Sequence, residues 1–403
     1  MIPLDEAQRF VLAACPPLER SSRPLEGALG AVLAAPVVTR EAVPPFDNTA
    51  MDGFAVRAAD TLGAPRELPV VATLAAGAAP GRAVGPGEAI RIMTGAPMPA
   101  GADAIVIVET TEEPVPGRVR ILETVQPGEH VRRAGTDLRP GQEVFPAGTV
   151  LGPGHVGVLA SLGHRHVETY RTPRVGVLST GDELVDDTRP LAPGQIRDSN
   201  RPALLAAAAA SGFEAVDLGL VRDDPAALEA ALSTAATRVD AILTSGGVSV
   251  GDFDHTKRVL GALAGDTMRS MQVAIRPAKP FAFGRIGRVP VFGLPGNPVS
   301  SLVSFELFAR PALRQMAGHT ALFRPRSWAV LDDGYRRVPD GKLHFVRVRL
   351  VRDGAHPLRA TSAGGQSSHQ LLAMAVADGL ALVPDGHGIE PGGEVEVLVL
   401  GAG

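Results

Sequence analysis

Three glycine-containing loops in the middle of the chain carry the residue types best suited to hold a ligand. They are residues 179–183 (STGDE), 245–252 (SGGVSVGD) and 293–300 (GLPGNPVS), and each lies at the end of an apolar segment. Glycine permits close backbone approach, and the free N–H groups at a helix N-terminus favour phosphate. A single loop of this kind is a plain turn between a strand and a helix about as often as it is a ligand-binding loop. Three together favour a shared anion pocket, although none has the Walker A or Rossmann pattern.

Acidic residues crowd the same loops, and they are Asp182, Glu183, Asp198, Asp223, Asp252 and Asp254. Beside phosphate, Mg²⁺ is commonly held by one or two carboxylates together with water. The alternative for any single residue is a helix cap, because Asp223, Asp224 and Asp254 all precede expected helices. As a set that faces phosphate loops, the carboxylates predict a divalent-metal site.

Basic residues near these loops could offset the charge of an anionic ligand. Arg276 and Lys279 lie beside Pro277 and Pro280 in a segment that cannot be helical, and Lys257 follows the second loop. Each of them alone could equally be an exposed surface cation. The histidines do not show the spacing of a zinc motif.

The elements that must position these loops alternate between strands and helices from about residue 174 to residue 316. Strands are expected at 174–179, 215–220, 240–244 and 289–294, and helices after Ser199 or Asn200, after Pro225, at 256–263 and at 298–317. Apolar strands that alternate with helices predict a mostly parallel sheet covered on both faces. Ligands bind at the carboxyl ends of the strands in such sheets.

The rest of the chain predicts further domains. Helices are expected at 4–14 and 24–33, a glycine- and proline-rich β region at 39–140, and strands at 328–331, 345–350 and 395–400. The alternation at 345–350 puts Arg347 and Arg349 on one face of a strand. We therefore expect a multidomain α/β plus β protein with four parts. These are a connecting β/helical domain (21–40 and 141–165), a glycine-rich β domain (41–140), the α/β domain (1–20 and 166–320) and a C-terminal β domain (325–403).

Composition points to a soluble cytoplasmic protein. The chain has 403 residues, a net charge of −4 and one cysteine, Cys15. A nucleic-acid surface normally brings a basic excess, and no polybasic run or signal peptide is present. We expect neither a nucleic-acid partner nor a membrane association.

Two further stretches have an unusual composition. Residues 43–56 (VPPFDNTAMDGFAV) and 91–99 (RIMTGAPMP) closely resemble signature segments of the family that contains bacterial molybdopterin molybdenumtransferase, its plant homologue and the E domain of gephyrin. Segments 179–183, 245–257, 275–283 and 293–300 are similar to the same family in the same order. The resemblance covers nearly the whole chain and is weakest after about residue 325.

The resemblance implies an elongated subunit that forms a homodimer, with the active cleft between the α/β domain of one subunit and the glycine-rich β domain of the other. It implies that molybdate is inserted into adenylylated molybdopterin with release of AMP, in a step that needs Mg²⁺. Carried over by position, the candidate site residues are Asp52, Thr94, Arg132, Asp137, Glu183, Asp223, Ser245, Gly246, Gly247, Asp254, Arg276, Lys279, Pro295, Gly296, Asn297, Pro298 and Ser368.

Roles within this set follow from the same resemblance. Glu183 and Asp223 would position the metal or water, and Asp254 with the loop 245–247 would hold the ligand. Asp52 and Thr94 would reach the site from the partner subunit. The family pattern has two lysines where this chain has Gln272 and Arg276, so one positive charge is lost.

Three alternatives stay open at this point. A molybdopterin adenylyltransferase has only the α/β part and lacks the Asp52 and Thr94 motifs. A molybdopterin-binding scaffold without catalysis would have lost the acidic cluster, which is present here. A paralogue that inserts tungstate cannot be separated by sequence, because tungstate and molybdate have nearly the same size and charge. The adenylyltransferase and molybdoenzyme-maturation proteins are the candidate partners besides a second copy.

Overall fold

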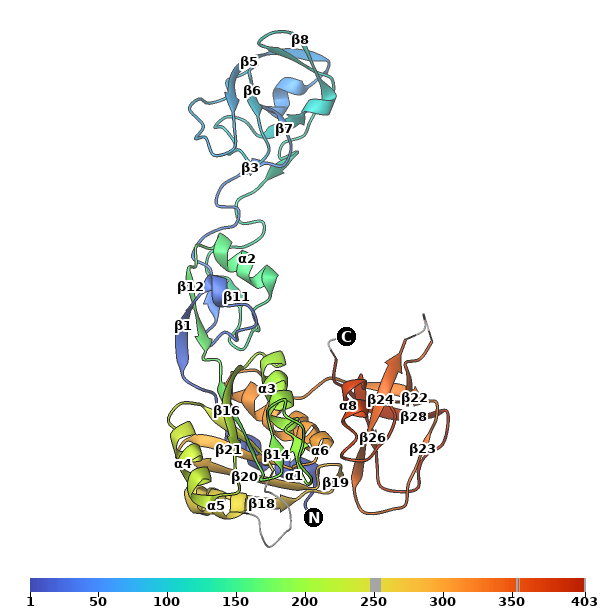
Figure 1. Cartoon of the computed structure of the whole chain (residues 1–403). Coiled ribbons are helices and arrows are strands. Elements are labelled where there is room, and N and C mark those ends of the chain that lie inside the picture. The colour runs from blue at the N-terminus through green and yellow to red at the C-terminus, as the bar shows by residue number, and fades with distance from the viewer. Residues whose placement is uncertain (247–254, 353, 355, 402–403) are drawn as a thin grey trace. The chain divides into compact units, whose positions relative to one another are not determined.

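The computed structural model describes residues 1–246, 255–352, 354 and 356–401. They form two compact units (Figure 1). Unit 1 contains residues 1–22, 30–34 and 168–403, and unit 2 contains residues 23–29 and 35–167. No helix among the described residues is long and apolar enough to cross a membrane.

A six-stranded mixed sheet forms the centre of the α/β part of unit 1. In spatial order its strands are β16 (Glu214–Val221), β13 (Arg174–Thr180), β17 (Ala241–Ser245), β21 (Val289–Leu294), β20 (Pro280–Ile286) and β18 (Arg269–Gln272). The first four are parallel, β20 pairs antiparallel with β21, and β18 pairs antiparallel with β20 and so runs in the same direction as the first four. The predicted mostly parallel sheet is confirmed.

Helices cover both faces of this sheet (Figure 1). They are α1 (Leu4–Ala13), α3 (Asn200–Ala210), α4 (Pro225–Ala235), α5 (His255–Ala264), α6 (Pro298–Ser304) and α7 (Arg310–Met316), with the π-helical turn η5 (Phe305–Ala309) between the last two. Because side chains alternate along a strand, β17 sends Leu243 into the core with α1 and α3, and Ile242 into the core with α4 and α5.

The C-terminal part of unit 1 is a β-barrel. Its strands are β24 (Leu343–Val351), β25 (Arg359–Ser362), β22 (Arg326–Leu331), β28 (Gly393–Val399) and β26 (Gly379–Val383), and β26 pairs with β24 to close the ring. The short elements β23 (Tyr335–Arg336), β27 (Gly388–Ile389) and α8 (Leu371–Ala375) lie in its connections. Strand β19 (Ile275–Arg276) of the α/β part pairs with β24. Phe345, Leu380 and Leu398 of the barrel belong to the same core as α1 and α7.

Unit 2 has its own sheet and its own core. The strands are, in order, β7 (Ala104–Ile107), β4 (Gly53–Val56), β6 (Ala89–Ile92), β5 (Arg66–Leu74), β9 (Arg118–Ile121) and β8 (Thr111–Val115). Further elements are β2 (Val37–Val38), β3 (Asn48–Thr49), β10 (Val131–Arg132), β11 (Glu143–Phe145), α2 (Pro153–Ser161) and the 3₁₀ turns η2 (Ala58–Thr61) and η3 (Val108–Thr110). The division of this unit into a connecting domain and a glycine-rich domain stays a prediction.

One expected helix is wrong. Residues 24–33 hold only the end of β1 (Arg20–Pro24) and the 3₁₀ turn η1 (Leu25–Gly27). Gly30 has a φ of 77°, which a helix cannot contain. The buried residues Leu25, Ala28, Val32 and Leu33 have the spacing of a helix face, but the backbone does not form the helix.

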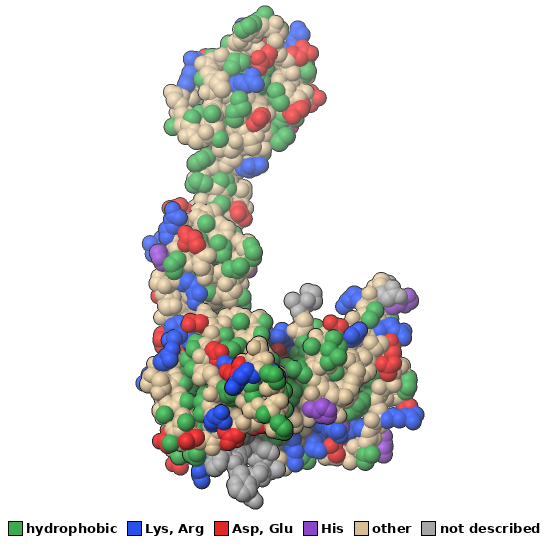
Figure 2. All heavy atoms as spheres, viewed as in Figure 1, with side chains coloured by type: hydrophobic (Ala, Val, Ile, Leu, Met, Phe, Trp, Pro, Cys, Tyr) green, Lys and Arg blue, Asp and Glu red, His purple; other side chains and the backbone are tan. Residues whose placement is uncertain are grey.

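Charged side chains of both signs are interspersed on the face drawn in Figure 2, over both units. Neither sign forms one large field there.

Candidate functional site

A cavity of about 610 Å³ opens at the carboxyl ends of β13, β17 and β21. Its walls come from the three predicted loops, from the segment 196–200 that leads into α3, and from His369 of the barrel part. Parallel pairing aligns the strand ends, since Ser179 lies opposite Ser245 and Ser245 opposite Leu294. The three loops thus meet at one place, as a ligand pocket in an open sheet requires.

Glycines let the loops come this close. Gly246 has a φ of 101°, and a Cβ on it would lie 2.6 Å from the backbone oxygen of Thr180. A Cβ on Gly296 would lie 3.7 Å from Cα of Gly246. The loop after β17 therefore has space for glycine alone, between the loop after β13 and the loop after β21.

Glu183 and Asp223 both line this cavity with exposed side chains. The Thr180 hydroxyl donates to Asp223 Oδ1 at 2.9 Å, and the carboxylate of Glu183 lies over Gly181. Asp224, not Asp223, caps α4 by accepting from the backbone N–H groups of Ala226 and Ala227. Asp223 is therefore not needed as a helix cap.

These two carboxylates suit a magnesium ion that shares its shell with phosphate and water, because Mg²⁺ usually takes only one or two protein carboxylates. A group of three or more His, Cys, Asp or Glu side chains able to hold a metal does not occur in the described part of the chain. A divalent ion held by Glu183 and Asp223 would need further oxygens from a ligand or from water.

Asp198 has a structural role beside the cavity. Its side chain, 1% exposed, accepts from Ser179 Oγ at 3.0 Å and from Arg201 Nε at 3.1 Å. Its Oδ1 also accepts from the backbone N–H of Arg201 at 3.2 Å. The carboxylate of Asp198 thus accepts a backbone hydrogen bond in the first turn of α3, and Ser199 at the N-cap position makes no side-chain cap.

Asn200 is a lining residue that the sequence did not single out as a site residue. Its amide nitrogen donates to Ser245 Oγ at 2.7 Å and to the backbone oxygen of Gly296 at 2.6 Å. The side chain thereby joins the loops that follow β17 and β21. The only signal in the sequence was its place at a helix start, which suggested a cap.

The barrel part supplies the remaining wall. Ser368 does not line the cavity, but its backbone oxygen accepts from Val299 N at 3.1 Å and brings its neighbour His369 to the cavity. Arg347 holds this segment from the outer face of β24, opposite the side chains of Val346 and Val348 in the barrel core, since its Nη2 donates to the backbone oxygens of Gly365 and Ser367. Arg347 is completely buried, and burial lowers the pKa of its guanidinium. Of the two arginines predicted on one face of the strand, only Arg349 is exposed.

Eight of the predicted site residues line the cavity, and they are Glu183, Asp223, Ser245, Gly246, Pro295, Gly296, Asn297 and Pro298. Gly247 and Asp254 were also predicted, and they lie outside the described residues.

Arg276 and Lys279 are exposed and do not line this cavity. Arg276 lies on β19 opposite His344 of β24, and its charge contributes to the lowered pKa of His344, which is chiefly caused by burial. Gln272 ends the edge strand β18 and pairs with Pro280. Arg276 thus lies at the border between the sheet and the barrel.

Four predicted residues belong to unit 2. Both the backbone N–H and the hydroxyl of Thr94 donate to Asp52 Oδ1, each at 2.6 Å. These hydrogen bonds, that from the hydroxyl first, lower the pKa of Asp52 below its ordinary value. Arg132 donates to the backbone oxygen of Ala50 at 3.4 Å, and Asp137 is exposed. Asp52 and Thr94, far apart in the sequence, form one polar pair.

Comparisons with known proteins agree along the whole chain. Family profiles match residues 2–163 ("MoeA N-terminal region (domain I and II)"), 176–315 ("Probable molybdopterin binding domain") and 330–400 ("MoeA C-terminal region (domain IV)"). The chain is 41% identical over 393 residues to molybdopterin molybdenumtransferase 2 of Mycobacterium tuberculosis strain H37Rv, covering 95% of both chains. It is 36% identical over 400 residues to the molybdopterin molybdenumtransferase of Haemophilus influenzae, covering 99% of this chain and 98% of that one.

A solved structure of the same family has the same fold as this chain. The crystal structure of the molybdopterin biosynthesis MoeA protein from Pyrococcus horikosii matches with a TM-score of 0.83 and 33% identity, over 99% of each chain. The likeness in sequence and structure extends over the strand-end cavity, the β domain and the barrel alike. The chain therefore belongs to the MoeA family of molybdopterin molybdenumtransferases, enzymes of molybdenum-cofactor biosynthesis.

Proposed function

We propose that this chain inserts molybdate into adenylylated molybdopterin and releases AMP, with Mg²⁺ at Glu183 and Asp223. The observation that carries the proposal is the cavity where three strand-end loops and these two carboxylates meet. A volume of about 610 Å³ is within the range of small-molecule sites. Relatives that are 36–41% identical over nearly the full length bear the name of this activity, which supports the substrate class.

Each loop would contribute a different kind of contact to the ligand. The glycine contacts around Gly246 give close backbone access to the phosphates of the ligand, and Ser245 and Asn297 offer polar side-chain atoms beside them. Pro295 and Pro298 restrict the loop that contains Asn297, because proline fixes its own φ. The site would hold the diphosphate in one orientation while its bond to the AMP phosphate breaks.

Glu183 and Asp223 would hold the magnesium ion. The bound ion would supply positive charge to the phosphate oxygens as the phosphoanhydride breaks. Thr180 would orient Asp223 through its hydrogen bond of 2.9 Å. Asp198 would keep the cavity wall in place and would not be a ligand, because Arg201 and Ser179 already donate to its two oxygens.

A homodimer completes the proposal. Asp52 and Thr94 of a second copy would reach the cavity as the polar pair that their two hydrogen bonds already form. Gly247, Asp254, Ser368, Arg276 and Lys279 would contribute to binding the ligand. The reaction would take place in the cytoplasm, with the adenylyltransferase as the supplier of substrate.

The test is AMP release from adenylylated molybdopterin by the purified protein, with and without molybdate and Mg²⁺. We expect release that depends on both ions and that Glu183→Ala lowers at least a hundredfold. Glu394→Gln is the matched control, because this exposed carboxylate lies on β28 of the barrel. Tight substrate binding without AMP release would refute the transferase and leave a scaffold. Faster release with tungstate than with molybdate would refute the molybdate assignment.

A further inference from the structure

The amide of Asn200 is oriented by its two partners. The backbone oxygen of Gly296, 2.6 Å from the Asn200 side chain, can only accept a hydrogen bond. The atom facing it must therefore be the amide nitrogen, and the alternative assignment with the oxygen in that place is excluded. The second hydrogen on this nitrogen points to Ser245 Oγ at 2.7 Å.

This orientation fixes the role of the Ser245 hydroxyl. A hydroxyl has one hydrogen to donate and two lone pairs that accept. One lone pair of Ser245 Oγ accepts from Asn200, so its own hydrogen must go elsewhere. Within the described part of the chain the structure gives that hydrogen no protein acceptor, although Ser245 is only 2% exposed and lines the cavity. The cavity that Ser245 lines can supply an acceptor for it.

The neighbouring strand end shows the opposite arrangement. Thr180 gives its hydroxyl hydrogen to Asp223 Oδ1 at 2.9 Å and so orients a carboxylate. Ser245 receives a hydrogen bond and keeps its hydrogen. The two adjacent strand ends thus offer different groups to a ligand. Next to Thr180 the carboxylate of Asp223 can accept, and at Ser245 the hydroxyl can donate.

We propose that Asn200 is a positioning residue that makes Ser245 a hydrogen-bond donor to the phosphate of the bound adenylate. The proposal rests on the proposed function, which places that phosphate in the cavity. Asn200 acts through Ser245, and its bond to Gly296 also holds the loops after β17 and β21 in register. A phosphate should bind more tightly to a Ser245 hydroxyl held as a donor, because a charged acceptor strengthens a hydrogen bond from a buried hydroxyl.

The chemistry at this position requires an amide. A carboxylate would accept the Ser245 hydrogen and would repel the carbonyl of Gly296. The hydroxyl would then present lone pairs to the cavity, where a phosphate has lone pairs of its own. An aliphatic side chain of the same shape would leave the hydroxyl free to rotate and the loops without their link.

The experiment measures binding of AMP and of adenosine to the full-length protein by titration calorimetry. The ratio of the two affinities isolates the contribution of the phosphate. We expect Asn200→Leu to lower AMP affinity about tenfold and leave adenosine affinity unchanged, as one charge-assisted hydrogen bond is worth about this much. Asn200→Asp should lower AMP affinity further, and Ser245→Ala should act like Asn200→Leu.

The double variant decides the mechanism. If Asn200 acts through Ser245, adding Asn200→Leu to Ser245→Ala should lower AMP affinity little beyond Ser245→Ala alone. Ser211→Ala, in the residue that caps the other end of α3, controls for helix stability and should bind AMP as the wild type does. Melting temperatures of all variants show whether each is folded, and Asn200→Asp replaces Asn200→Leu if the latter is not.

Two results would overturn the inference in distinguishable ways. Full additivity of Asn200→Leu and Ser245→Ala, in a wild type that prefers AMP over adenosine, would refute the positioning role alone. A wild-type protein that binds AMP no better than adenosine would refute the phosphate site of the proposed function, and this inference with it.

Discussion

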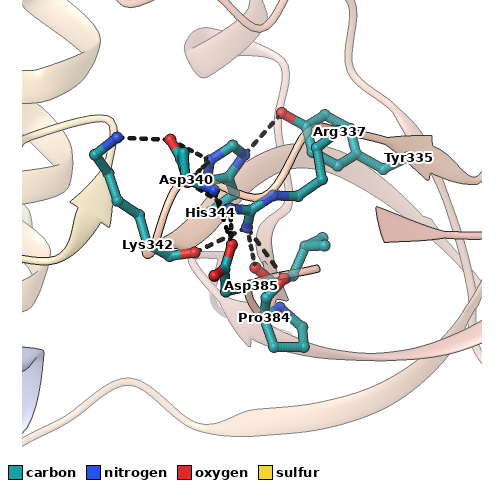
Figure 3. A network of polar contacts seen from close by, with 8 residues as sticks. Tyr335, Arg337, Asp340, Lys342, His344, Pro384 and Asp385 are labelled. Carbon is teal, nitrogen blue, oxygen red and sulfur yellow. Dashed lines mark hydrogen bonds and ion pairs between the residues drawn. The ribbon is translucent and has the colours of Figure 1, made fainter. Parts of the chain in front are cut away.

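Carboxylates in two regions of unit 1 use their oxygens differently. In the strand-end cavity, Asp223 accepts one side-chain hydrogen bond, and the described residues include no donor to the side chain of Glu183. In the barrel, Asp340 accepts from Arg337, Lys342 and His344 (Figure 3). The cavity therefore leaves acceptors available to a ligand, whereas the barrel network uses its acceptors within the protein.

The network in Figure 3 is built around a buried cation. The side chain of Arg337 is 2% exposed and donates to Asp340, to Asp385 and to the backbone oxygens of Lys342 and Pro384. The hydrogen bond from Lys342 is the main cause that lowers the pKa of Asp340 to about 2. A carboxylate with so many donors stabilises the fold. The same residue type with few donors is suited to bind a metal or phosphate.

The largest effect should come from closing the cavity. Gly246→Ala puts a Cβ 2.6 Å from the Thr180 oxygen at a φ of 101°, which strains the backbone by about 1–3 kcal/mol. Because shifts near 1 Å at a site cost about a hundredfold in rate, AMP release should fall by about that factor. Gly261→Ala in α5 is the matched control, since a Cβ there meets nothing within 4 Å. Equal activity of both variants would show that the three loops need not meet so closely.

A smaller effect, on stability alone, is expected from the barrel network. Asp340→Asn removes charge-assisted bonds and should lower the free energy of unfolding by about 1–2 kcal/mol, with AMP release retained. The folded-state pKa of Asp340, about 2, is below its ordinary 3.8. Its stabilisation is therefore present above about pH 4 and is lost as pH falls toward 2.

Thermal melts from pH 7 to pH 2.5 measure this effect, with Glu394→Gln as the control. The gap in melting temperature between wild type and Asp340→Asn should shrink below pH 4. A gap that stays constant over this range would contradict the ionised network.

The smallest effect concerns Asp52 in unit 2. This carboxylate accepts more hydrogen bonds than Glu183 in the cavity and fewer than Asp340 in the barrel, and both of its donors belong to Thr94. Thr94→Val removes the hydroxyl and keeps the backbone N–H, so the pKa of Asp52 should rise part of the way toward its ordinary value of 3.8. The wild-type carboxylate is then ionised to a lower pH than that of the variant. Carboxyl NMR titration measures the shift, and an unchanged pKa would mean that the hydroxyl bond contributes nothing.

The sequence predicted the parallel sheet well, because its strands appear as continuous apolar segments between helices. The apolar strands ending at Thr180, Ser245 and Leu294 made the parallel sheet and the meeting of the loops predictable, because strand ends in such a sheet share an edge. The helix expected at 24–33 was wrong since Gly30, with a φ of 77°, interrupts it.

The polar contacts of the site were less predictable. A residue at a helix start, such as Asn200, can cap the helix or reach across to other strands, and only the fold decides. Alternation along β24 grouped Arg347 with Arg349 correctly, but it could not show that residues 365–367 cover Arg347. Contacts between segments far apart in the sequence leave no local signal.

The link between Arg347 and the segment that ends at His369 has a consequence for how the protein is made. The lining of the cavity begins at Thr180 and ends at His369, and the barrel that holds His369 is closed by β28 near the C-terminus. Synthesis proceeds from the N-terminus, so a nascent chain has the loops of the sheet long before it has the final wall. The wall at His369 is therefore in place only after the strands of the barrel have also been synthesised.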